Sequence, residues 1–169
     1  MNLIKSDING YYSPEDPGEP GGGKRLSVND EEARIIATFC KGKRVLEIGT
    51  GLGVATRIIA KAASHVVTID IDPFVIENVF PALMEYRNID CLTIPQTDLE
   101  FFDACLIDGL HTYDQCIEDI QTAHARVKKG GLLIFHDYHM MQVRCAIYDS
   151  GLDHFYIKST AGIAIAWNE

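Results

Sequence analysis

Two short stretches of the sequence carry the side chains best suited to proton transfer. Asp108 and His111 stand in the segment IDGLHTY, and His136 and Asp137 stand in FHDY. An imidazole titrates near neutral pH, and a neighbouring carboxylate can orient the ring and stabilise its charge. We therefore take these four residues as the candidate catalytic residues.

The same stretches are candidates for a divalent metal site. We predict Asp108, His136 and Asp137 as its ligands, because a hard cation between two carboxylates offsets their repulsion and lowers the pKa of a coordinated hydroxyl. Carboxylates favour Mg²⁺, whereas an imidazole ligand shifts the preference toward manganese, iron or zinc. A metal-free alternative stays open, in which His111 or His136 removes the proton and a carboxylate orients the imidazole.

A glycine-rich segment earlier in the chain is typical of a cofactor loop. Residues 47–53 read EIGTGLG, and the first two of them are the last two residues of the apolar run RVLEI. Glycines at a turn from strand to helix let a ligand approach the backbone at the start of the helix. A dinucleotide loop requires glycine three residues after Gly51, where this chain has Val54. The segment therefore disfavours a nicotinamide cofactor.

An acidic residue ends the next apolar run, HVVTID. Asp70 can accept hydrogen bonds from both hydroxyls of a ribose, as acidic residues at this position do in nucleotide-binding sheets. Asp72 stands two residues further on and precedes Pro73, which favours the first position of a helix. We predict that Asp70 binds a ribose and that Asp72 caps the helix.

A second glycine-rich segment, GEPGGGKR at residues 18–25, almost matches a phosphate-binding loop. Its last position is Arg25, where the loop needs a serine or threonine to ligate magnesium, and no apolar strand precedes it. We interpret residues 1–25 as a flexible N-terminal segment and residues 26–169 as a single domain.

Apolar runs and helical periodicities alternate along the rest of the chain. The predicted strands are RVLEI, HVVTI, CLTI, ACLI and GLLIF, followed by HFYIKS and GIAIAW as an antiparallel pair. A capping box at Asn29 and Glu32 predicts a first helix to about Cys40. Pro81 should divide another helix into two pieces, and Lys128 to Gly130 should end the helix that begins near Cys116.

This alternation predicts a doubly wound α/β sheet that is mostly parallel, with helices on both faces. Ligands of such sheets bind at the carboxyl ends of the strands. The glycine loop, Asp70, IDGLH and FHDY all follow predicted strands, so we expect them at that edge.

The pattern Glu47-x-Gly49-x-Gly51-x-Gly53 resembles the first motif of the class I S-adenosylmethionine-dependent methyltransferases. The IDGxHxY and FHDY stretches resemble a branch of small-molecule O-methyltransferases in that family. The resemblance implies a Rossmann-like sheet of seven strands whose last strand is antiparallel. It also implies S-adenosylmethionine as cofactor. The implied binding residues are Glu47, Gly49, Thr50, Gly51, Gly53, Asp70, Ile71 and Asp98.

Within that set, Ile71 would pack against the adenine and the turn that contains Asp98 would reach its amino group. The implied reaction is O-methylation of a small hydroxylated metabolite such as a sugar or a polyketide. The chain has no inserted substrate domain, which leaves open a second hypothesis, a cofactor-binding module without transferase activity. Acceptor recognition would fall to the N-terminal segment, the loops or a neighbouring subunit of a homo-oligomer.

Composition limits the classes of partner. A formal net charge of −9 disfavours nucleic acid and anionic membranes, because the overall field repels phosphate. The five cysteines form no CxxC pair, and no apolar run reaches the ~18 residues of a membrane span. We expect a cytoplasmic protein with reduced thiols and a small-molecule acceptor.

Overall fold

A seven-stranded sheet forms the centre of the structure, a computed structural model that describes residues 12–13, 24–25, 28–94 and 101–169. The strand order is β5-β4-β3-β6-β7-β9-β8. The strands are β3 Arg44–Ile48, β4 His65–Ile69, β5 Ile89–Leu92, β6 Phe102–Ile107, β7 Val127–Phe135, β8 His154–Ile157 and β9 Ile163–Trp167. Strands β5, β4, β3, β6 and β7 pair in parallel, and β9 is antiparallel to both β7 and β8. The predicted fold is confirmed.

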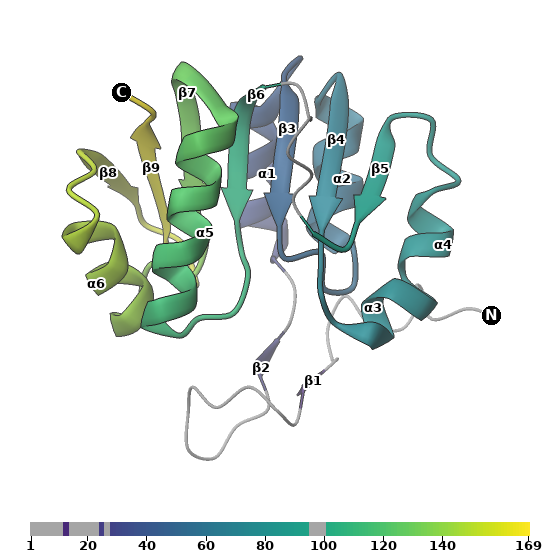
Figure 1. The fold of residues 1–169 in the computed structure, drawn as a ribbon, viewed down its shortest axis with the longest axis horizontal. Helices are drawn as coiled ribbons and strands as arrows, with labels where there is room; N and C mark the ends of the chain where they lie inside the picture. Colours follow the sequence, from purple (N-terminus) through teal and green to yellow (C-terminus); the bar gives the residue numbers. More distant parts are fainter. Residues whose placement is uncertain (1–11, 14–23, 26–27, 95–100) are drawn as a thin grey trace.

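Helices cover both faces of this sheet (Figure 1). On one face lie α1 Asp30–Cys40 and α2 Val54–Ala62, with the short helices α3 Pro73–Asn78 and α4 Phe80–Leu83 beside them. On the other face lie α5 Tyr113–Arg126 and α6 Met141–Asp149. Buried side chains from each helix layer pack on the sheet and form one apolar core per face.

Local sequence signals explain most of the helix boundaries. Asn29 accepts hydrogen bonds from two backbone N–H groups of α1, and Glu32 completes the predicted capping box. Asp72 caps α3 by accepting from the Phe74 N–H, with Pro73 at the first helical position, as predicted. Pro81 lies at the start of α4, so the two short helical pieces are also confirmed.

Some details differ from the sequence prediction. Strand β5 is Ile89–Leu92 and begins two residues before the predicted CLTI, because Ile89 pairs with Val66 of β4. Helix α5 ends at Arg126, and Lys128 to Gly130 belong to β7, whose first residue Val127 is buried and pairs with Phe102. Helix α2 buries Ala55, Thr56, Ile59 and Ala60. Val54 and Ile58 of the same helix are only partly buried.

The described residues before α1 form a small ladder, β1 Tyr12–Ser13 with β2 Lys24–Arg25, paired antiparallel. In Figure 1 the ladder lies below the sheet, on the side toward which β3, β4 and β6 point. Most of the GEPGGGKR segment lies outside the described residues. Among the helices that the structure describes, none has both the length and the apolarity to cross a bilayer.

Candidate functional site

The carboxyl ends of four neighbouring parallel strands bring the predicted site residues to one edge of the sheet. The glycine loop follows β3, Asp70 follows β4, Asp108 follows β6, and His136 and Asp137 follow β7. Because β3 lies between β4 and β6, the glycine loop stands between Asp70 on one side and Asp108 on the other. The arrangement is the one expected for ligand binding in an open α/β sheet.

Asp70 holds the glycine loop in place. One oxygen of its carboxylate accepts hydrogen bonds from the backbone N–H groups of Thr50 and Gly51, each at 2.9 Å. The other oxygen accepts from the Asp72 N–H at 2.9 Å. The hydroxyl of Thr50 lies 2.6 Å from that of Thr68 in β4. Asp70 therefore fixes the loop in addition to its predicted contact with a ribose.

Gly49 brings the glycine loop into direct contact with the end of β6. Its φ of +93° lies in the region that favours glycine, and a Cβ there would stand 2.1 Å from the Asp108 carbonyl oxygen. Both the backbone conformation and the close approach therefore require glycine.

We expect Gly49→Ala to destabilise the fold more than Gly42→Ala. Gly42 also has a positive φ, +71°, but a Cβ added there would have no atom within 4 Å. The control thus carries only the left-handed backbone cost of about 1–2 kcal/mol, whereas Gly49→Ala adds a backbone clash of about 1–3 kcal/mol. Urea denaturation measures both. Equal losses of unfolding free energy would show that the loop shifts away from Asp108 without cost.

Glu47 lies beneath the loop rather than on the surface of the cleft. The side chain is fully buried, and one carboxyl oxygen accepts hydrogen bonds from Thr56 of α2 and Thr68 of β4, each at 2.6 Å. Burial raises the pKa of Glu47 to about 8, since the two hydroxyls only partly compensate for lost hydration. In this structure Glu47 joins β3, β4 and α2 as a mostly neutral acid, with none of its surface open to a ligand.

Of the remaining predicted cofactor-binding residues, the structure describes Gly51, Gly53 and Ile71. Gly51 and Gly53 both have positive φ angles, and Gly53 is the residue that precedes α2. Ile71 is 76% exposed beside Asp70. Asp98 lies outside the described residues.

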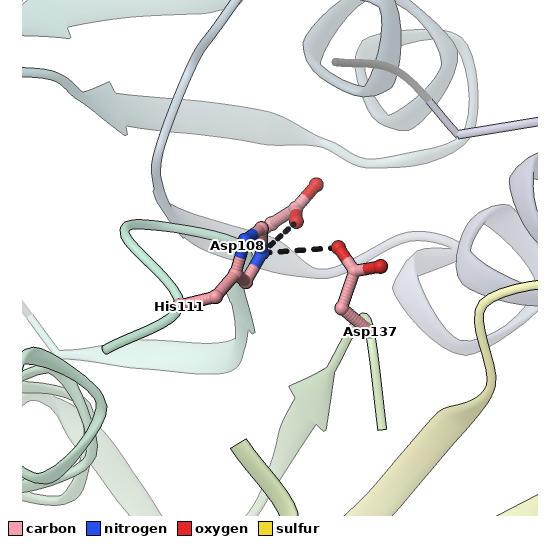
Figure 2. A group of neighbouring side chains, drawn as sticks. All are labelled: Asp108, His111 and Asp137. Carbon is pink, nitrogen blue, oxygen red and sulfur yellow. Dashed lines mark ion pairs between the residues drawn. The ribbon is translucent and has the colours of Figure 1, made fainter. Parts of the chain in front are cut away.

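The four candidate catalytic residues form one cluster. Figure 2 shows the His111 ring between two carboxylates. Its Nε2 lies 3.0 Å from Oδ2 of Asp137 and 3.6 Å from Oδ1 of Asp108. His136 contacts the same two carboxylates through Nδ1, at 3.0 Å from Asp137 and 3.2 Å from Asp108. Two imidazoles and two carboxylates therefore alternate around a shared centre.

A fifth charged residue joins the cluster from helix α1. Nε2 of His136 lies 3.3 Å from Oε2 of Glu32, and both side chains are almost fully buried. In the sequence, Glu32 stands out only as part of the capping box of α1. No local signal shows that a residue more than a hundred positions earlier meets His136, because that contact depends on how α1 packs against the sheet.

Mutual attraction outweighs burial in setting the charge states of this cluster. Burial alone would lower the pKa of His111, but Asp108 and Asp137 raise it to about 10. Asp108 and its neighbours likewise raise the pKa of His136 well above its usual range, despite burial. Burial alone would raise the pKa of Asp137 and of Asp108. The two imidazoles nevertheless lower the pKa of Asp137, and His136 lowers that of Asp108. The contacts between imidazoles and carboxylates therefore favour the protonated form of each imidazole and the ionised form of each carboxylate.

The geometry adds His111 to the residues that could hold a metal ion. Asp108, His111 and Asp137 each offer an atom, and these atoms all lie within 4.8 Å of one another. The third ligand predicted from the sequence, His136, presents Nδ1 to the same two carboxylates at 3.0 and 3.2 Å, while its Nε2 faces Glu32. Two carboxylates with one imidazole suit a divalent cation, so the donor chemistry fits the predicted metal.

A family model described as a methyltransferase domain matches residues 46–138. This match covers more than half of the chain and runs from β3, through the glycine loop, to the FHDY stretch. The chain belongs to this methyltransferase family. A comparison with curated protein sequences finds no match.

Solved structures share the fold of this methyltransferase at low sequence identity. The cofactor-bound protein Rv0187 from MTB superposes with a TM-score of 0.74 at 20% identity, covering 86% of this chain and 84% of its own. The O-methyltransferase TomG from Streptomyces achromogenes, in complex with SAM, gives 0.68 at 17% identity and coverages of 85% and 82%. The N-methyltransferase NodS from Bradyrhizobium japonicum WM9, with S-adenosylhomocysteine, gives 0.64 at 16% and coverages of 85% and 89%.

Proposed function

We propose that this methyltransferase uses S-adenosylmethionine to methylate a hydroxyl group of a small metabolite, such as a sugar or a polyketide. Family membership supports methyl transfer. The observation that carries the rest is the contact of Gly49 with the Asp108 backbone, which sets a cofactor loop directly beside a cluster of acids and imidazoles. Such a pairing suits a methyl donor next to groups that can activate a hydroxyl.

The cofactor would bind along the edge formed by the glycine loop and the end of β4. Gly49, Thr50, Gly51 and Gly53 would bring the backbone close to it. Asp70 would accept from the ribose hydroxyls, Ile71 would cover the adenine, and Glu47 would support the loop from below. Asp98 keeps its predicted role near the adenine amino group, on a segment outside the described residues.

We expect Asp70→Ala to weaken S-adenosylhomocysteine binding about tenfold or more. The variant loses the ribose acceptor and also the two hydrogen bonds that fix the loop, each worth roughly 1.5–3 kcal/mol gross when one partner is charged. Calorimetric titration measures the affinity. Asp72→Ala is the matched control, since it removes a nearby carboxylate that caps α3 without contacting the loop. Equal losses in the two variants would contradict the role of Asp70.

The acceptor hydroxyl would lie against the acid–imidazole cluster. Asp108, His111, His136 and Asp137 are the residues available to orient it and exclude water, and an imidazole would take its proton only after losing the proton that the neighbouring carboxylates stabilise. Asp108 and Asp137 would also hold a divalent cation, with His111 as the third ligand by geometry and His136 as the one predicted from the sequence. When bound, such an ion lowers the pKa of a coordinated hydroxyl.

The decisive test combines binding with turnover. Calorimetry with S-adenosylmethionine, S-adenosylhomocysteine and NADH should show binding of the first two alone, and tight binding of NADH alone would overturn the cofactor assignment. A panel of hydroxyl, amine and thiol acceptors should then give methylation of hydroxyl compounds. Binding without any turnover would favour the cofactor-binding module instead.

A further inference from the structure

Glu32 is buried in a way that its capping role does not require. A glutamate at the third position of a capping box needs only to reach back to the first residue of the box, here the Asn29 N–H at 3.2 Å. Glu32 is nevertheless only 2% exposed, whereas the adjacent Glu31 faces solvent. A buried carboxylate is costly unless several partners compensate for its lost hydration, so its other contacts identify what it does.

The second oxygen of Glu32 binds the turn between β8 and β9. Oε1 accepts hydrogen bonds from the hydroxyl of Ser159 at 3.0 Å and from the backbone N–H of Ala161 at 2.6 Å. The Ser159 hydroxyl in turn accepts from the Gly162 N–H at 3.0 Å. One carboxylate therefore joins the start of α1 to the turn of residues 159–162.

That turn supports the backbone that carries Asp137. The N–H groups of Tyr138 and His139 donate to the carbonyls of Gly162 and Ala161, at 3.1 and 2.9 Å. Asp137 itself has a φ of +55°, a left-handed conformation that its surroundings must maintain. By holding the turn, Glu32 supports the segment in which the aspartate takes this conformation.

Glu32 also reaches the cluster directly. Its Oε2 lies 3.3 Å from Nε2 of His136, while Nδ1 of the same ring contacts Asp108 and Asp137. A single imidazole thus lies between the Glu32 carboxylate and the two carboxylates at the candidate reaction centre.

We propose that Glu32 is a positioning residue for this centre: it orients the His136 ring from below and holds the 159–162 turn, and so fixes Asp108 and Asp137 for the acceptor. The proposal rests on the function proposed above. Glu32 does not touch the reacting groups and acts through His136 and the turn.

Glu32→Gln tests this assignment, because glutamine keeps the shape and removes the charge that faces His136. We expect kcat to fall about tenfold or more, as is typical when a group that orients a site residue is changed. The affinity for S-adenosylhomocysteine should stay within about twofold, since Glu32 does not contact the glycine loop. The NMR signals of the His136 imidazole should shift, which a general loss of stability would not cause in the folded protein.

Two controls separate positioning from helix stability. Glu31→Gln makes the same charge change on the exposed neighbour, and Asn29→Ala removes the side-chain cap of α1 without removing the Glu32–His136 contact. Both should keep kcat and the His136 signals of the parent protein. A similar fall in kcat for Asn29→Ala, or unchanged His136 signals in Glu32→Gln, would overturn the proposal.

The readouts also separate this proposal from the proposed function. If the parent protein binds no S-adenosylhomocysteine or methylates no acceptor, the proposed function fails, while the His136 signals still report whether Glu32 orients the ring. If Glu32→Gln does not fold, Ser159→Ala removes one hydrogen bond that orients the same carboxylate. It should shift the His136 signals in the same way, and unchanged signals would overturn the proposal.

Discussion

Asp137→Asn is expected to reduce kcat about a hundredfold or more, the range typical for losing a group that assists proton transfer. The change removes the charge that both imidazoles contact at 3.0 Å. Asparagine tolerates the left-handed conformation of residue 137, so the backbone should persist. Steady-state kinetics with the preferred acceptor gives kcat, and calorimetry with S-adenosylhomocysteine checks that the cofactor site is intact.

Asp153→Asn is the matched control for this substitution. Asp153 is exposed just before β8, and its neutralisation changes the net charge equally. It should retain the kcat of the parent protein. An Asp137→Asn variant that kept a third or more of the parent kcat would show that Asp137 lies outside the reaction centre.

Removal of divalent metal is expected to abolish turnover, and Mg²⁺ or Mn²⁺ should restore it. The carboxylates of Asp108 and Asp137 raise the pKa of both imidazoles that contact them. Because the pKa of His111 is raised to about 10, an ion that takes this ring as ligand must displace a proton. Metal affinity should therefore rise with pH, by up to about tenfold per unit below that pKa, which Mn²⁺ titrations at two pH values measure.

Turnover that survives thorough chelation, with no gain on adding either ion, would rule out the metal. It would leave the alternative in which His111 or His136 takes the proton and a neighbouring carboxylate orients the ring. A Mn²⁺ affinity that does not change with pH would instead argue that neither protonated imidazole is a ligand.

Local sequence patterns predict the sheet and most helix boundaries because these depend on nearby residues. Asn29, Asp72 and Pro81 act within one or two helical turns, and each sets a boundary at the position that the sequence indicates. The predicted start of β5 and end of α5 are wrong for the opposite reason. Pairing of Ile89 with Val66 and of Val127 with Phe102 comes from strands distant in sequence.

The same distinction applies to the candidate site. The predicted Asp108, His111, His136 and Asp137 do come together, because each follows a parallel strand or lies within a few residues of its end. Their detailed roles need tertiary contacts. The buried position of Glu47, the loop contacts of Asp70 and the arrival of Glu32 from α1 all involve partners many residues away.

The close approach of Gly49 to Asp108 offers a route by which ligands at the two halves of the candidate site would affect each other. If a bound cofactor shifts the loop, the carbonyl it touches and the carboxylate on the same residue must respond. Linkage then requires reciprocity. The factor by which bound cofactor raises the affinity of the acidic cluster for its ligand equals the factor by which that ligand raises the affinity for the cofactor. In that case, a contact too close to admit a methyl group would let binding at one half change the affinity at the other.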